Sequence, residues 1–165
     1  MRIFYLFSLL ILIHCNLEAQ TGSKNYVKVG AGIYAAVPLY NLDMSATGAG
    51  GDIMLQYVVS DKVWLTADGG FAGLPGKKNY PATAIIPIRV GARYFPLTKV
   101  YVGVKAGLGI YTILKASANH TAYAAGAGYF LTDRLEAGIS YDGYTNRNSS
   151  FGYGSVRLAY NFINR

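Results

Sequence analysis

Apolar residues alternate with small or polar ones, at a period of two, through nearly all of the chain after residue 25. Successive side chains of a β-strand point to opposite faces, so this period predicts strands with one apolar face each. The pattern recurs in eight segments on the order of ten residues long, at about residues 27–39, 52–59, 63–71, 86–95, 100–111, 123–131, 135–142 and 155–162. Helices are disfavoured, because Gly (20 residues) and Tyr (15 residues) are costly or neutral in them.

The charged residues inside these segments all occupy the alternate positions, which we call the second parity, and never the positions of the apolar residues, the apolar parity. They are Lys28, Asp52, Asp68, Arg89, Arg93, Lys105, Glu136, Asp142 and Arg157. Five are basic and four are acidic, so a shared interior would let them nearly neutralise one another. The apolar parity is free of charge in all eight segments.

The connections between the segments alternate in length. Three are short polar turns, Ser60-Asp61-Lys62, Leu97-Thr98-Lys99 and Thr132-Asp133-Arg134, and the others are longer, at about residues 40–50, 73–84, 115–121 and 145–150. Short turns at one end and longer loops at the other predict an up-and-down antiparallel meander.

The absence of charge on the apolar face of the strands indicates whether that face meets water or lipid. Charged residues make up 14% of the chain, against about 25% in an average protein. A soluble barrel carries charges outside, whereas a membrane barrel turns its apolar face outward and closes so that no strand edge stays unpaired. We therefore predict an all-β fold, an eight-stranded antiparallel up-and-down transmembrane β-barrel. The nine charged strand residues would form a network in its lumen.

Aromatic residues recur near the ends of the expected strands. Those placed at the turn end are Tyr57, Tyr94, Tyr129, Tyr160 and Phe162, and those placed at the opposite end are Phe71, Tyr123 and Tyr141. The high strand propensity of aromatic residues would scatter them, whereas this register aligns them. The alignment predicts two aromatic girdles at the membrane interfaces.

The first residues have the order of a secretory leader. A basic residue, an apolar run over residues 3–13 and the small Ala19 are typical of a signal peptide. We expect residues 1–19 to be that peptide and residues 20–165 to be the barrel domain. Cys15 leaves a lipoprotein signal open as an alternative. After cleavage no cysteine would remain, so disulfides and thiol-ligated metals are not expected.

Strand number, loop asymmetry and girdles together resemble the small outer-membrane β-barrel family of Gram-negative bacteria, the eight-stranded OmpX-like and OmpA-barrel-like group. The resemblance extends over nearly all of residues 25–162. The family's assembly signal is similar to Gly-x-x-aromatic-x-aromatic. Tyr160 and Phe162 match it, whereas Arg157 takes the Gly position and residues 163–165 extend past it. The resemblance implies an outer-membrane location, contact with membrane lipids and lipopolysaccharide, and the barrel-assembly machinery as a partner during insertion. We expect a monomer.

The lumen of an eight-stranded barrel is just wide enough for its own side chains to fill it. Rings expected to share it with the charges are Tyr26, Tyr34, Tyr101, Tyr111, Tyr153, Phe95 and Phe130. One hypothesis is a narrow channel for ions or small solutes, lined by Arg89, Arg93, Lys105 and Arg157. The other is a network of ion pairs that plugs the lumen, which the need to pair buried charges favours.

His120 is the only histidine after the leader, within the expected loop 115–121. It could be the general base of a lipid-modifying enzyme, which would need a nucleophile and an orienting carboxylate in reach. The lipid A deacylase family pairs its His with a Ser two residues later, where this chain has Ala122. The sequence also contains no metal-ligand cluster and no phosphate-binding loop. We therefore predict no enzyme, no catalytic residue and no cofactor.

The longer loops are basic. Lys77, Lys78, Lys115 and Arg147 are candidate contacts to lipopolysaccharide phosphates. The net charge of +7 is dispersed, without a basic helix or patch, so nucleic acid is not an expected partner. The predicted function is a structural or surface-interaction role. A channel and a lipid-modifying enzyme are the alternatives.

Overall fold

The computed structural model describes residues 26–39, 45–77, 80–114, 116–147 and 149–164. The expected signal peptide over residues 1–19 and the Cys15 alternative lie outside the described residues. Within the described ranges, the structure contains no helix long and apolar enough to cross a membrane.

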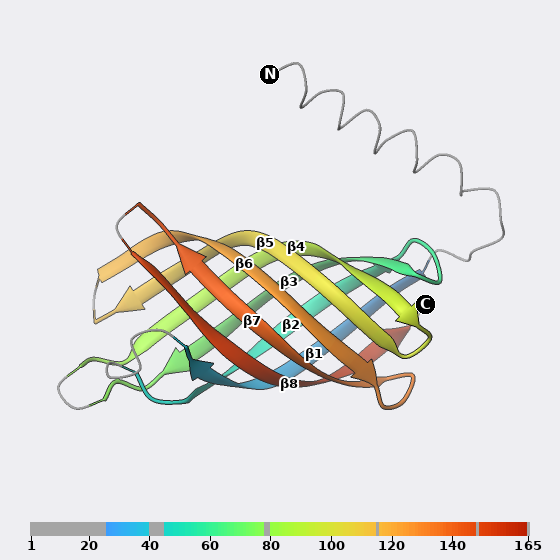
Figure 1. Cartoon of the computed structure of the whole chain (residues 1–165), viewed down its shortest axis with the longest axis horizontal. Helices are drawn as coiled ribbons and strands as arrows, with labels where there is room; N and C mark the ends of the chain where they lie inside the picture. Colours follow the sequence, from blue (N-terminus) through green and yellow to red (C-terminus); the bar gives the residue numbers. More distant parts are fainter. Residues whose placement is uncertain (1–25, 40–44, 78–79, 115, 148, 165) are drawn as a thin grey trace, which may run out of the picture.

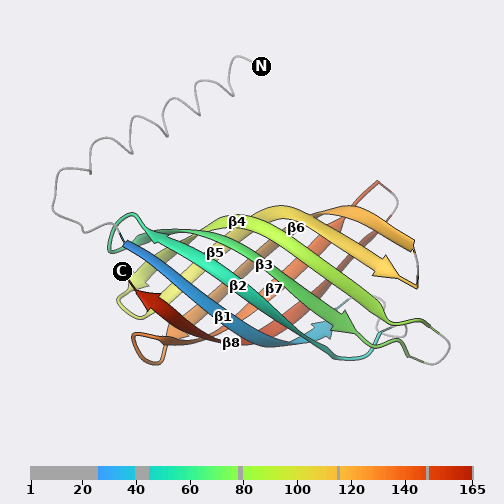
Figure 2. The same cartoon turned by 180° about the vertical axis from the view of Figure 1, so that it is seen from behind.

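Eight strands form one closed antiparallel barrel, in which each strand pairs with its neighbours in sequence and β8 closes against β1. They are β1 (Tyr26–Pro38), β2 (Gly48–Val58), β3 (Val63–Leu74), β4 (Thr83–Leu97), β5 (Val100–Ile113), β6 (Ala116–Phe130), β7 (Leu135–Thr145) and β8 (Ser150–Asn164). Figures 1 and 2 show them running obliquely around the barrel. The predicted all-β, eight-stranded up-and-down barrel is confirmed.

The two ends of the barrel differ. The tight turns after β2, β4 and β6 gather at the end where β8 finishes, on the right of Figure 1, and we call this the turn end. The connections after β1 and β3 lie at the opposite end, which we call the loop end, and they are the longer ones.

The expected loop over residues 115–121 is wrong. β5 runs to Ile113 and β6 begins at Ala116, directly opposite it, so only two residues connect them. Leu114 has a φ of 55°, the left-handed backbone that two-residue hairpin turns favour. The small and polar residues of this stretch form a strand because their backbone pairs with β5, which requires no apolar parity.

The barrel wall has two chemically distinct faces, as the alternation predicted. Ile33 and Val90 point outward and are 71% and 66% exposed, and the other apolar residues of their parity are similarly placed. Each charged strand residue that the structure describes points inward and is buried or half-buried. The apolar side chains therefore cover the outside and the charges lie within.

Glycines make room for large inward side chains. At Gly109 in β5, an added Cβ would lie 2.6 Å from Cδ1 of Tyr144, whose ring lies across the glycine. At Gly32 in β1, it would lie 2.7 Å from the guanidinium carbon of Arg157. The absence of a side chain at these positions is what admits the neighbouring large group.

We predict that Gly109→Ala destabilises the barrel by about 1–3 kcal/mol, because the Tyr144 ring must leave its packed position. Gly69→Ala is the matched control, since its nearest neighbour, the carbonyl oxygen of Pro87, would lie 4.0 Å from the new Cβ. Urea unfolding in detergent micelles measures both. Equal stability of the two variants would contradict the steric role of Gly109.

Candidate functional site

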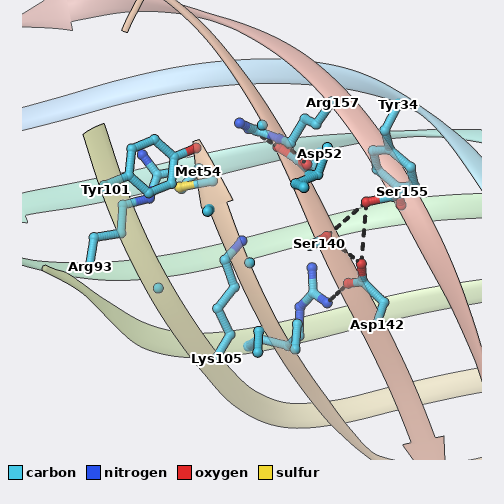
Figure 3. Close-up of a pocket in the computed structure, with 18 of the residues that line it drawn as sticks. Tyr34, Asp52, Met54, Arg93, Tyr101, Lys105, Ser140, Asp142, Ser155 and Arg157 are labelled. Atoms are coloured by element: carbon cyan, nitrogen blue, oxygen red, sulfur yellow. Dashed lines mark hydrogen bonds and ion pairs between the residues drawn. The ribbon is translucent and has the colours of Figure 1, made fainter. Parts of the chain in front are cut away.

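A layer of ion pairs crosses the middle of the lumen, and its half nearer the loop end is centred on Arg89. This guanidinium on β4 donates from Nη2 to Asp68 Oδ2 on β3 at 2.7 Å and also pairs with Asp142 on β7. Lys105 Nζ on β5 lies 3.2 Å from the other oxygen of Asp68. Ser140 Oγ donates to Asp142 at 2.7 Å, and Figure 3 shows both groups facing the cavity. Four strands are thus joined by one cluster of charges.

The half nearer the turn end is centred on Glu136 of β7. Arg93 on β4 binds it through two parallel N–H donors at 2.8 and 2.9 Å, and Arg157 on β8 binds it through Nη1. Nε of Arg157 donates to Asp52 on β2 at 2.8 Å, a pairing visible in Figure 3. Bidentate guanidinium–carboxylate contacts are among the strongest charge-assisted hydrogen bonds. This cluster therefore holds side chains of β2, β4 and β8 together with Glu136 on β7.

Neutral amides extend the second cluster. Gln56 Oε1 accepts a hydrogen bond from Arg93 at 2.9 Å, and its Nε2 donates to Asn161 Oδ1 at 2.6 Å. Both amides are 1% exposed. The network therefore links β2, β4, β7 and β8 across the lumen.

The carboxylates Asp52, Asp68, Glu136 and Asp142 are each paired with a cation. Their partners are Arg89, Arg93, Lys105 and Arg157, so this central layer is formally neutral.

Lys28 is the remaining lumen cation, and among the described residues it makes no ion pair. Its Nζ lies 4.5 Å from the centre of the Trp64 ring, 5.4 Å from that of Phe130 and 5.5 Å from that of Tyr26. The faces of aromatic rings attract a cation, so this cage supports the charge in place of a carboxylate.

Clusters of buried aromatic and aliphatic residues, which we call caps, lie on both sides of the charged layer. The turn-end cap consists of Val58, Trp64, Phe95, Tyr101 and Phe130, with Tyr26 packed against it. The loop-end cap consists of Tyr34, Ala36, Ala72, Leu74, Ile85, Ala122, Tyr144 and Tyr153, with Tyr111 and Phe151 packed against it. A cavity of about 60 Å³ lies between the caps, lined in part by Asp52, Arg89, Arg93, Lys105 and Arg157. It has room for a few water molecules.

The residues predicted for the girdles all lie on the outer wall. Near the turn end are the exposed Tyr57, Tyr94, Tyr129, Tyr160 and Phe162. In the loop-end half are the exposed Phe71 and Tyr123 and the half-buried Tyr141, and the rings of Tyr123 and Tyr141 are 6.2 Å apart. Their contact with a membrane interface remains a prediction.

His120 lies inside the barrel, on β6, and is only 3% exposed. Its expected place in a loop over residues 115–121 is therefore wrong. Nδ1 lies 3.3 Å from the carbonyl oxygen of Ala118 and Nε2 lies 3.0 Å from Ser149 Oγ. The ring also contacts Tyr111 and Phe151. Among the described residues, its hydrogen-bond partners include no carboxylate. The contact between His120 and Ser149 joins the β7–β8 connection to β6.

Two of the four basic residues proposed to meet lipopolysaccharide can be located. Lys77 and Arg147 are exposed, in the connections that follow β3 and β7. Lys78 and Lys115 lie outside the described residues. No group of three or more His, Cys, Asp or Glu residues in the described ranges could hold a metal ion.

Sequence reasoning missed two inward residues at the loop end. The inward parity of Ala124 and Phe130 continues backward to His120, and that of Glu136 and Asp142 continues forward to Tyr144. Continuing the alternation of β6 by four residues, and that of β7 by two, would have placed the side chains of His120 and Tyr144 inside the barrel. The change to small and polar residues around position 117 hid this continuation.

Comparison with known proteins identifies the fold. No protein-family model matches the chain, and no curated protein matches it significantly. Among solved structures, Neisserial surface protein A is 20% identical with a TM-score of 0.57, over 85% of this chain and 98% of its own. The Yersinia pestis outer-membrane protein Ail, in a phospholipid bilayer nanodisc, is 13% identical with a TM-score of 0.59, over 83% and 100%. A de novo designed transmembrane β-barrel is 18% identical with a TM-score of 0.54, over 81% and 94%.

The chain has the fold of the small outer-membrane β-barrels. The resemblance stated from the sequence is thereby borne out at the level of the fold.

We predict that Arg89→Met destabilises the barrel by about 3–5 kcal/mol, because it leaves Asp68 and Asp142 as buried charges without their shared partner. Adding Asp142→Asn should restore part of the loss. The exposed turn residue Lys62 supplies the control, and Lys62→Met should change stability by no more than about 0.5 kcal/mol. Unfolding midpoints in urea test this, and a loss at Arg89 as small as at Lys62 would mean that the lumen solvates its charges.

Proposed function

We propose that the chain is an integral protein of the bacterial outer membrane, exported through a cleaved signal peptide, with a structural or surface-interaction role. The observation that carries this proposal is the chemistry of the wall. Apolar side chains such as Ile53, Ile88, Val104 and Ile139 are more than 60% exposed around the circumference. Water would oppose so large an apolar surface, whereas hydrocarbon accepts it.

The girdle residues support the same orientation. Tyrosine on an outer wall suits the headgroup region, because its ring meets hydrocarbon while its hydroxyl meets water, and outer-membrane barrels carry girdles of aromatic residues at both interfaces. The turn end would then face the periplasm and the loop end the cell exterior, where Lys77 and Arg147 could meet lipopolysaccharide phosphates. The barrel-assembly machinery would be the partner during insertion, and the folded protein would be a monomer.

A plugged lumen supports action at the surface rather than transport. Paired charges hold the central layer together, and each of its sides is covered by an aromatic cap. A channel would need a continuous hydrated path, and the cavity between the caps is about 60 Å³. The names of two neighbours, a surface protein and an attachment invasion locus protein, agree with a surface role.

A lipid-modifying enzyme is the less favoured alternative. The contact between His120 and Ser149 is the feature of the described residues that recommends it. However, His120 lies inside the wall, away from the acyl chains that such an enzyme would attack. Lipid A mass spectra from cells with and without the protein would separate this alternative from the proposed role.

We predict that Val90→Arg, in the middle of β4, costs about 2–4 kcal/mol in lipid, because it places a charge at the bilayer midplane. Leu97→Arg, at the end of the same strand, should cost about 0–1 kcal/mol. Both native residues are 66% exposed, so burial against protein does not distinguish them. Refolding titrations in lipid vesicles measure both costs. Equal costs at the two positions would contradict the membrane-spanning orientation.

We also predict that the protein in planar bilayers produces no steady unitary conductance, because the caps and ion pairs fill the lumen. Gly32→Ala and Arg93→Ala, which disturb that filling, should give at most irregular openings. A steady conductance in the unaltered chain that disappears in Arg93→Ala would instead establish the channel alternative.

A further inference from the structure

A second cavity opens at the loop end, above the loop-end cap. Its volume is about 100 Å³, and its walls include Pro38, Leu74, Tyr80, Pro81, Tyr111 and Phe151. For comparison, an engineered cavity of about 150 Å³ in another protein binds benzene. An open pocket of this size can accept one six-membered ring while the substituents of that ring stay in solvent.

The aromatic wall of this loop-end pocket is held in place. Phe151 lies between two rings, with its centre 4.6 Å from that of Tyr111 and 4.9 Å from that of Tyr144, which is stacked on it. His120 packs against both Tyr111 and Phe151. Because these rings are fixed by one another, a ligand would meet a preformed surface.

Tyr80 forms a second aromatic side of the pocket, and this residue is 47% exposed. Its backbone N–H donates to the carbonyl oxygen of Lys77 at 3.0 Å.

The pocket also contains hydroxyl groups. Thr83 Oγ1 and the Tyr111 hydroxyl lie 3.4 Å apart, and Ser45 completes this polar side. Two hydroxyls that share one hydrogen bond retain one proton and several lone pairs for another partner. A purely hydrocarbon ligand would leave these groups unmatched, whereas a ring with an apolar face and hydroxyls at its edge satisfies both kinds of wall.

The charge of the loop end indicates the charge of the ligand. Arg147 and Lys77 are exposed at this end, and by sequence the loop-end connections hold four basic residues against one acidic residue, Asp43, a formal charge of about +3. A positive field around a pocket favours anionic ligands.

From this combination we infer that the loop-end pocket binds the ring of an acidic saccharide, with the ring face against the aromatic wall and the hydroxyls at Thr83 and Tyr111. This inference rests on the proposed function, which places the loop end at the cell exterior. The sugar could belong to lipopolysaccharide of the same membrane or to a soluble glycan, and the chemistry of recognition is the same for both.

The test uses the full chain refolded in phospholipid nanodiscs and two matched probes, methyl glucuronide and methyl glucoside. Saturation-transfer NMR reports contact and calorimetry reports affinity. We expect the glucuronide to bind about tenfold more tightly than the glucoside. Arg147→Gln should reduce that preference, and Thr83→Val, which keeps the shape, should weaken both probes.

The decisive comparison is Tyr80→Ala against Tyr129→Ala. Tyr129 is 45% exposed on the outer wall at the turn end, so it matches Tyr80 in type and exposure but lies outside the pocket. Tyr80→Ala should weaken binding about tenfold and Tyr129→Ala should leave it unchanged. Absence of saturation transfer to both probes, or equal losses in the two variants, would overturn the inference.

A third arm distinguishes the sources of the sugar. Nanodiscs that contain lipopolysaccharide should suppress binding of the soluble glucuronide if a lipopolysaccharide sugar occupies the pocket, and undiminished binding would assign the pocket to a soluble glycan. Cell fractionation with a heat-modifiability gel tests the outer-membrane location separately. A barrel found outside that membrane would therefore refute the proposed function without deciding saccharide binding in nanodiscs.

Discussion

Pairing of opposite charges across the lumen is the interaction on which the rest of this barrel depends. Backbone hydrogen bonds join each strand only to its neighbours, whereas Arg89 and Arg93 on β4 reach Asp142 and Glu136 on β7. Such charges are tolerated in a narrow interior only when each finds a partner. Because the interior absorbs the strand charges in this way, the outer wall can remain uncharged over the strands that the structure describes. The same pairing supports a filled lumen.

The two ends of the barrel differ in what their caps contact. The turn-end cap surrounds Lys28, the one lumen cation without an ion pair in the described chain, with aromatic faces. The loop-end cap carries a pocket on its outer side, and the His120–Ser149 contact ties the β7–β8 connection beside it. The packed rings of the loop-end cap can therefore present a preformed surface at one end. This arrangement supports the proposed role at the surface.

The sequence carried most of the fold because strand alternation is a local property. Lys28, Asp68 and Arg157 each occupy the inward parity of their own strand, and that parity can be read without knowing any partner. The alternation failed where the outward positions of β6 changed from apolar to polar residues, at Ser117, Asn119 and Thr121. Backbone pairing with β5 formed that strand, and pairing is not visible in composition.

By itself, the sequence determined the number of strands, their two faces and the set of charges that share the interior, because each follows from a period of two. Only the tertiary structure decided which charges meet. Asp52 pairs with Arg157 and Asp68 with Arg89 because closure and register bring these positions together. The same closure placed His120 beside Ser149 and left Lys28 to the rings of Trp64 and Phe130. Pairs of this kind depend on distances between strands remote in sequence, and the geometry of the closed barrel sets those distances.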